Sequence, residues 1–255
     1  MKIMDLIKDL FFVNGAVIKK SSKSFFKNWM IIFTGFVYTI ISTVAFTLIN
    51  TLFQGILNII AGLLTAILVS SLVSNYLNLL YGVIKYDKIS IQDFKEGFKQ
   101  YIWKIYGIYF IIWIVSYLLE GIGGIAGSNG GALMNIITIG AFIIFNPLPE
   151  VIYQKDRSSL ESLTYSAGFM AENWINWIIP NLIFSYVLYK LTGGIILDLL
   201  TTHIAFNFDF SLFGIGKYLV EQIVFSFTMI YRGHLFDILN TSTRRKRLYM
   251  RKYYD

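Results

Sequence analysis

The basic residues of this chain fall in a few short segments that long apolar runs keep apart. The connections at the other ends of the apolar runs contain no Lys or Arg. Multi-pass membrane proteins show this asymmetry because their cytoplasmic segments retain the positive charge. We therefore expect a multi-pass protein of the bacterial inner (cytoplasmic) membrane, with both termini in the cytoplasm. Twenty of the 22 Lys and Arg residues lie in segments 1–28, 85–104, 155–173 and 231–255.

The apolar runs themselves predict the fold class. Only 15% of the 255 residues are charged, and 56% are hydrophobic. A bilayer crossing needs about 20 mostly apolar helical residues, whereas a membrane β-barrel needs short segments of alternating polarity, which these runs lack. We expect an all-α polytopic bundle of six transmembrane helices. The predicted spans are 29–53, 55–84, 105–119 with its flanks, 132–152, 174–197 and 212–230.

The remaining segments predict amphipathic helices on the cytoplasmic surface. The first covers residues 1–27, with Ile7, Leu10 and Phe11 on its apolar face, and segments 85–104 and 155–173 are similar in pattern. Surface helices that alternate with pairs of spans would make three helix-hairpin units, unless the recurring aromatic residues are merely typical of a membrane interface. We thus expect a membrane domain over 1–240 and a basic cytoplasmic tail over 241–255.

Several classes of protein are disfavoured by what the chain lacks. It has no cysteine, which excludes disulfides and thiolate metal sites. The predicted topology places His203 and His234 on opposite sides of the membrane, and no catalytic or metal-ligand cluster stands out. We expect a non-enzymatic protein without a cofactor. The net charge of +7 is explained by topology, so no nucleic-acid partner is expected.

Two charged residues inside the predicted spans form the most specific candidate site. Intramembrane charges are costly and are usually paired or functional. Lys190 and Glu221 lie at matching distances from the connection between the last two spans. We therefore expect them to form an intramembrane ion pair, with Lys217, four residues before Glu221, as the competing partner.

A second candidate site is a polar vestibule open to the cytoplasm. Prolines near the ends of two spans would free backbone carbonyls, and amide side chains lie at a similar predicted depth. The alternative is ordinary polarity at the membrane interface. The vestibule would comprise Asn75, Asn78, Glu150, Asn173, Asn176 and Pro180.

The tail supplies a third candidate site. Its basic run consists of Arg244, Arg245, Lys246 and Arg247. Each basic residue near an anionic membrane surface contributes about 1 kcal/mol of attraction. We expect this run to contact anionic lipid headgroups, so the lipid bilayer is the first expected partner.

The segment PLPEVIYQKDRSSLESLTYSAGFMAENW (147–174) and the closing YRGHLFDIL (231–239) carry a family resemblance. They resemble a loose group of poorly characterised bacterial six-span membrane proteins, which includes the membrane domain ahead of some glycerophosphoryl diester phosphodiesterases. The resemblance implies a multi-pass membrane protein with an envelope- or lipid-related role. It supplies no catalytic residues.

A competing resemblance links residues 161–180 to the ATPase-docking loop of importer-type permeases. Glu161, Gly168, Ile178 and Pro180 approximate its Glu-Ala-Ala, Gly and Ile-x-Leu-Pro positions. The two alanines are missing, the glycine is one residue late and the proline one residue early. This resemblance implies a permease subunit that binds a separate ATPase through 85–104 and 155–173, with Glu161 and Gly168 at the contact. Without an ATPase, we expect a lone protein or a homo-oligomer.

Overall fold

The computed structural model describes residues 3–125, 130–243, 246, 247 and 249, and within these ranges it contains helices and no strand. Short 3₁₀ turns at Trp29–Phe33 and Gly55–Leu57 precede the second and third α-helices. The α-helices are α1 (Ile3–Lys27), α2 (Thr34–Leu52), α3 (Asn58–Tyr86), α4 (Ile91–Gln100), α5 (Ile102–Ile125), α6 (Gly130–Ile144), α7 (Leu148–Gln154), α8 (Ser159–Thr192) and α9 (Leu212–Thr241). The predicted all-α class is confirmed.

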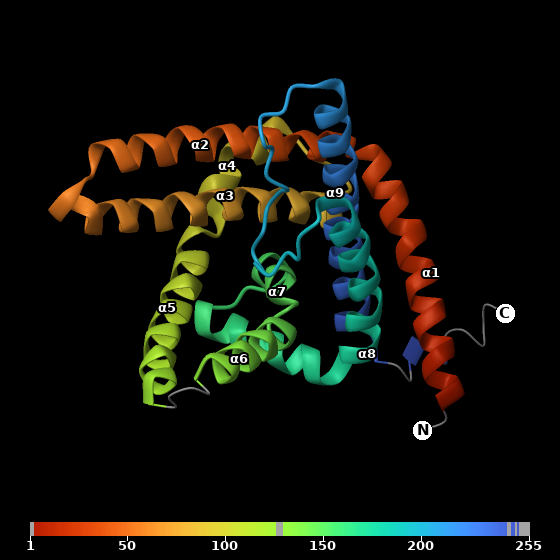
Figure 1. Cartoon of the computed structure of the whole chain (residues 1–255). Coiled ribbons are helices and arrows are strands. Elements are labelled where there is room, and N and C mark those ends of the chain that lie inside the picture. The colour runs from red at the N-terminus through yellow and green to blue at the C-terminus, as the bar shows by residue number, and fades with distance from the viewer. Residues whose placement is uncertain (1–2, 126–129, 244–245, 248, 250–255) are drawn as a thin grey trace.

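Consecutive long helices pack against each other as α2 with α3, α5 with α6, and α8 with α9. Figure 1 shows the α2–α3 hairpin running crosswise to α9 and to the adjoining part of α8, while α5 leaves the hairpin in another direction. Helix α4 packs along α3, and α1 packs along α9. The helix pairs thus diverge from a shared centre and do not form one parallel bundle.

Length and composition identify four described segments that could cross a membrane, not the six expected. They are Trp29–Leu52, Asn58–Tyr86, Ile102–Gly121 and Gly130–Gln154. The last two predicted spans do form helices, within α8 and α9. Their lower hydropathy follows from polar residues such as Asn181 and Lys190 in α8 and Glu221 and Gln222 in α9. The coarser prediction, an all-helical chain with several membrane-length helices, is the part that the structure confirms.

Local sequence signals set several helix boundaries. Ser90 and Ser158 cap α4 and α8 with reciprocal capping boxes to Asp93 and Glu161. Helix α6 ends before Pro147, and α7 follows with Pro149 in its first turn. Because no break separates 155–173 from the predicted fifth span, these two predicted elements form the single helix α8.

The core lies where the inner ends of the helices meet. Tyr76 and Val83 of α3, Ile105 of α5, Ile152 of α7 and Ile230 of α9 are fully buried there. Large apolar side chains are exposed farther out, for example Trp113 of α5 and Leu52 of α2. The molecule is therefore apolar outside at its extremities and tightly packed at its centre.

The connections within two of the helix pairs differ in structure. Most of the glycine-rich stretch 120–131 is helical, since α5 continues to Ile125 and α6 starts at Gly130; residues 126–129 lie outside the described ranges. The α8–α9 connection, residues 193–211, is non-helical apart from short turns and folds back into the molecule (Figure 1). Its Leu200, Thr202 and Phe206 are buried.

Candidate functional site

A buried ion pair joins α7 to α9 at the centre of the fold. Arg232 Nε donates to Glu150 Oε1 at 2.7 Å, and Arg232 Nη2 donates to Glu150 Oε2 at 2.9 Å. Arg232 also donates to the Asn146 carbonyl at 2.6 Å, and Trp177 Nε1 donates to Asn146 Oδ1 at 2.8 Å. The guanidinium carbon lies 5.2 Å from the centroid of the Trp177 ring. One arginine thus ties α7, α8 and α9 together.

The geometry of this network favours a structural role. The Glu150 side chain is fully buried and that of Arg232 is 13% exposed. Two parallel hydrogen bonds give such a pair both energy and a fixed orientation. Since each carboxylate oxygen already faces the guanidinium, the pair is held as two charges that compensate each other. This arrangement holds the inner ends of the helices in register.

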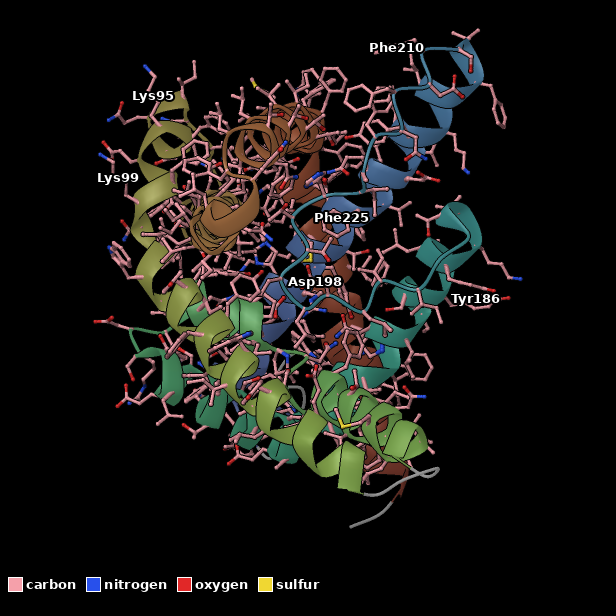
Figure 2. All side chains as sticks on the ribbon, turned by 60° about the vertical axis from the view of Figure 1, so that its left-hand side comes forward. Lys95, Lys99, Tyr186, Asp198, Phe210 and Phe225 are labelled. Carbon is pink, nitrogen blue, oxygen red and sulfur yellow. The ribbon has the colours of Figure 1, made fainter. Side chains whose placement is uncertain are left out.

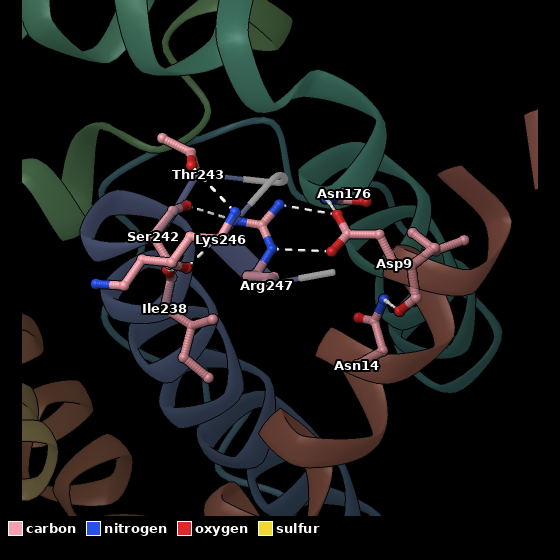
Figure 3. Close-up of polar contacts among 9 residues, drawn as sticks. Asp9, Asn14, Asn176, Ile238, Ser242, Thr243, Lys246 and Arg247 are labelled. Carbon is pink, nitrogen blue, oxygen red and sulfur yellow. Dashed lines mark hydrogen bonds and ion pairs between the residues drawn. The ribbon is translucent and has the colours of Figure 1, made fainter. Parts of the chain in front are cut away.

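A second buried ion pair joins the two ends of the chain. Arg247 Nε and Nη2 donate to the two carboxylate oxygens of Asp9 at 2.9 and 2.8 Å, and Asn176 Nδ2 donates to Asp9 Oδ2 at 2.8 Å (Figure 3). Arg247 Nη1 donates to the Ser242 carbonyl as well. We call Asp9, Asn176 and Arg247 the terminal clamp, because they link α1, α8 and the segment after α9.

The terminal clamp corrects the prediction for Arg247. That residue was expected to contact lipid headgroups, but its side chain is 6% exposed and its guanidinium is bonded to Asp9. Lys246 is exposed, which leaves it accessible to headgroups. Arg244 and Arg245 lie outside the described residues.

A polar groove lies beside the terminal clamp, between the first half of α8 and the end of α9. One cavity of 480 Å³ includes Glu161 and Gly168 in its lining, together with Arg157 and Tyr165. A neighbouring cavity of 400 Å³ continues to Arg247. The structure therefore brings the two residues of the predicted partner-docking site to one groove. The residues shared by both cavities are Glu172, Asn173, Leu239 and Asn240.

Hydrogen bonds to Ser158 stabilise the negative charge of Glu161 at the groove. The Glu161 side chain accepts from the Ser158 backbone N–H at 3.0 Å. This backbone hydrogen bond, followed by the bond with the Ser158 hydroxyl, lowers the pKa of the Glu161 carboxyl below its usual value. The carboxylate therefore stays ionised at neutral pH while it caps α8.

The structure distributes the predicted vestibule residues over separate contacts. Asn75 donates to the Phe94 carbonyl and Asn78 donates to the Asp93 carbonyl at 3.0 Å, so both fasten α4 to α3. Asn176 belongs to the terminal clamp, Glu150 to the central ion pair and Asn173 to the groove. Pro180 is buried within α8. The prediction of one shared vestibule is therefore wrong, because the amides bond to different helices: Asn75 and Asn78 to α4, Asn176 to α1, and Asn173 within α8.

The predicted Lys190–Glu221 ion pair is not formed. The Glu221 carboxylate lies 3.6 Å from Lys217 Nζ, the competing partner one helical turn away. Lys190 Nζ instead lies 5.5 and 5.9 Å from the ring centroids of Tyr186 and Tyr189. The helical spacing places Lys217 beside Glu221 without any tertiary rearrangement, which explains why the local partner is the one observed.

Sequence reasoning missed both buried arginine pairs. The sequence predicted Arg232 only as part of the basic segment 231–255, and Asp9 only as part of the amphipathic helix over 1–27. The available signal was weak in each case: Arg232 is separated from the basic tail by 11 residues, and Asn176 follows Trp174 in an apolar run. Neither spacing identifies a partner more than 80 residues away.

Comparisons with known proteins give no relative from which a role could be transferred. No protein-family model, curated protein or solved structure matches the chain.

Proposed function

We propose that this chain is a non-enzymatic, multi-pass protein of the bacterial cytoplasmic membrane, with both termini in the cytoplasm and an envelope- or lipid-related role. Six crossings would require the three helix pairs to lie more nearly parallel in a bilayer than they do in Figure 1, with their apolar outer parts in contact with lipid. Its basic segments and terminal clamp would lie at the cytoplasmic side, where Lys246 would approach anionic headgroups. The resemblance to six-span bacterial membrane proteins agrees with this proposal.

Exposed apolar surface is the observation that carries the proposal. Trp113, Tyr117 and Leu118 of α5 have exposed fractions of 63%, 69% and 60%. Leu182 and Ile183 of α8 are exposed to a similar degree. Soluble monomers rarely present contiguous apolar patches of more than a few hundred Å², whereas a bilayer solvates such surfaces. Exposed Ile7 and Phe11 give α1 an apolar face of the same kind.

The absence of cysteine permits a direct test of the topology. Gln54→Cys, Asn207→Cys and Asp156→Cys each place one thiol at an exposed connection. In intact cells, a membrane-impermeant maleimide should label positions 54 and 207, while position 156 should react only after permeabilisation.

The label at position 207 separates six crossings from four. If Asn207→Cys stays protected while Gln54→Cys reacts, α8 and α9 do not cross and the six-span proposal fails. If all three positions react equally in intact cells, the proposed orientation fails. Lipid analysis of the purified protein then tests the lipid-related role, which requires anionic lipid to be enriched over its share of the membrane.

A permease subunit is the second candidate function. The observation in its favour is that Glu161 and Gly168 border the same groove on the surface of α8. Space for a partner exists at Gly168, because a side-chain carbon added there would meet no atom within 4 Å.

A pull-down from native membranes in mild detergent distinguishes the two candidates. A stoichiometric soluble ATPase that is lost on Glu161→Ala and on Gly168→Leu, but kept on Glu120→Ala, an exposed acid outside both predicted docking segments, would establish the permease subunit. A lone protein or a homo-oligomer in the same experiment would favour the stand-alone membrane role.

A further inference from the structure

The returning loop between α8 and α9, residues 193–211, borders a polar site. Asp198 and Phe210 lie well apart on this loop (Figure 2), and both residues are exposed. The loop is fastened where the Ile204 N–H donates to Gln222 Oε1 at 3.0 Å and the Phe206 N–H donates to Thr39 at 3.4 Å. In membrane proteins, non-helical backbone within a bundle occurs where it is buried in protein or lines a water-filled cavity.

A small cavity lies between this loop and helices α6, α8 and α9. Its volume is 70 Å³, and its lining includes Asn181, Asp198, Thr201, Thr228 and Arg232. One water needs roughly 10–15 Å³ of such volume, so the cavity holds a few waters or a small ion with part of its hydration shell. Its size excludes a sugar, a nucleotide or a lipid headgroup.

Three uncharged side chains of the cavity lining, those of Asn181, Thr201 and Thr228, present hydrogen-bond acceptors. The hydroxyls of Thr228 and Thr201 each donate to a backbone carbonyl, at 2.7 and 2.9 Å, which leaves their oxygen lone pairs free. The Asn181 amide nitrogen donates to a carbonyl of its own helix at 2.7 Å. Asn181 is 7% exposed, and its Oδ1 is buried without a hydrogen-bond partner. This acceptor is available to a water or an ion, and leaving it unsatisfied costs about 1–3 kcal/mol.

The cavity lining contains one acid, Asp198, and one base, Arg232. Glu150, which lies outside the lining, forms an ion pair with Arg232, so the three residues together carry a net charge of −1. No ion pair joins Asp198 to another described residue. One Asp198 oxygen accepts from the Leu200 N–H at 3.0 Å, which leaves the second oxygen for a ligand.

Charge and donor type together select the ligand. Carboxylate, amide and hydroxyl oxygens are the ligands of hard cations. A single uncompensated carboxylate matches a single positive charge, and no group of three His, Asp or Glu residues suited to a metal ion occurs in the described parts of the chain. We propose that this cavity binds an alkali-metal cation through the Asp198 carboxylate, Asn181 Oδ1 and the hydroxyl oxygens of Thr201 and Thr228.

Cation binding would fasten the returning loop to α8 and α9. The inference does not rest on the proposed function, because it requires the cavity and not a particular number of membrane crossings. Topology labelling and cation binding can therefore fail independently.

The test compares thermal unfolding of the purified full chain in detergent with NaCl, KCl or choline chloride at equal ionic strength. Choline is too large for the cavity. At saturation, Na⁺ or K⁺ should raise the midpoint by roughly 5 °C over choline. Asp198→Asn, which preserves the acceptor for the Leu200 N–H, and Thr228→Val should each abolish this shift. Asp209→Asn, an exposed acid of the same loop, should retain it.

Retention of radioactive sodium by the same variants gives a readout that does not depend on unfolding. The wild type and Asp209→Asn should retain sodium, whereas Asp198→Asn and Thr228→Val should not. Equal midpoints in all three salts for the wild type would overturn the proposal. So would a folded Asp198→Asn variant that keeps the full shift, or sodium retention that Thr228→Val leaves unchanged.

Discussion

At the scale of single residues, the fully buried carboxylate of Glu150 depends on one arginine. Arg232→Ala would leave Glu150 without a counter-charge, and breaking a buried pair in this way costs about 3–5 kcal/mol. We expect Arg232→Ala to lower the thermal midpoint of the purified protein strongly. The double variant Arg232→Met with Glu150→Leu should recover much of the loss, since it removes both charges.

The exposed pair Lys27–Asp87 is the matched control for this prediction. Its nitrogen and oxygen lie 2.9 Å apart, close to the distances in the buried pair, but the Lys27 side chain is 57% exposed. Exposed ion pairs contribute about 0–1 kcal/mol, so Lys27→Ala should change the midpoint little. Equal effects of Lys27→Ala and Arg232→Ala would show that burial does not govern the contribution of the central pair.

His203 gives the returning loop a dependence on pH. Burial lowers the pKa of its imidazole from 6.5 to about 4. Its ring lies 5.9 Å from the Tyr38 ring, and its Nδ1 is 2.8 Å from the Thr202 hydroxyl. The unfolded chain therefore binds the proton more readily, and stability falls as the pH drops from about 6.5 towards 4.

Between pH 7 and pH 5 this group contributes a loss of at most about 2 kcal/mol. His203→Gln keeps a polar partner for Thr202 but cannot be protonated. The midpoint of the variant should thus fall less between these two pH values than that of the wild type. Parallel pH profiles for the two proteins would exclude His203 as the titrating group.

At the scale of helices, Gly233 sets how closely α9 approaches its neighbours. A side-chain carbon at this position would lie 2.5 Å from the Tyr153 hydroxyl of α7 and 2.7 Å from Ile84 Cδ1 of α3. Overpacking of a core typically costs about 1–3 kcal/mol, which outweighs the gain of roughly 0.5–1 kcal/mol from replacing a helical glycine. Gly233→Ala should therefore lower the thermal midpoint.

Gly62 of α3 is the control for Gly233→Ala, because a side-chain carbon there would meet nothing within 4 Å. Gly62→Ala should leave the midpoint unchanged or raise it slightly. A destabilised Gly62→Ala variant together with an unaffected Gly233→Ala variant would contradict the packing of α9 against α3 and α7.

Helix content was predictable from the sequence, whereas helix placement was not. Capping serines and the Pro147 break are local signals, and they mark real boundaries at Ser158 and Ile144. Tertiary partners have no such local signal. Spacing in the sequence predicted Lys190 as the ion-pair partner of Glu221. The observed partner is Lys217, which lies four residues earlier in the same helix and needs no tertiary contact to reach Glu221. The predicted vestibule failed for the same reason, because equal depth in a membrane does not bring Asn75 and Asn176 together.

At the scale of the whole molecule, the terminal clamp joins residues that are 238 positions apart. Asp9 is 1% exposed, and Arg247 supplies two of the hydrogen bonds to its buried carboxylate. Arg247→Ala should therefore weaken the attachment of α1 to α8 and to the segment after α9. Hydrogen exchange of α1 amides in the purified protein is the appropriate measurement, since it reports local opening even where the global midpoint moves little.

Charge reversal separates pairing from mere packing at the terminal clamp. Asp9→Arg combined with Arg247→Asp restores opposite charges, and the unpartnered Oδ1 of Asn176 can accept from the new arginine. The double variant should recover part of the hydrogen-exchange protection of α1 that either single change removes. Lys246→Ala, a change at the exposed neighbouring position, should leave this protection unchanged. Protection of α1 that survives Arg247→Ala unchanged would mean that apolar packing of Val13 and Val17 against α8 and α9 suffices to hold the helix. In that case the clamp would position the end of the chain beside the groove, and truncation after Thr241 would change the groove without loosening α1.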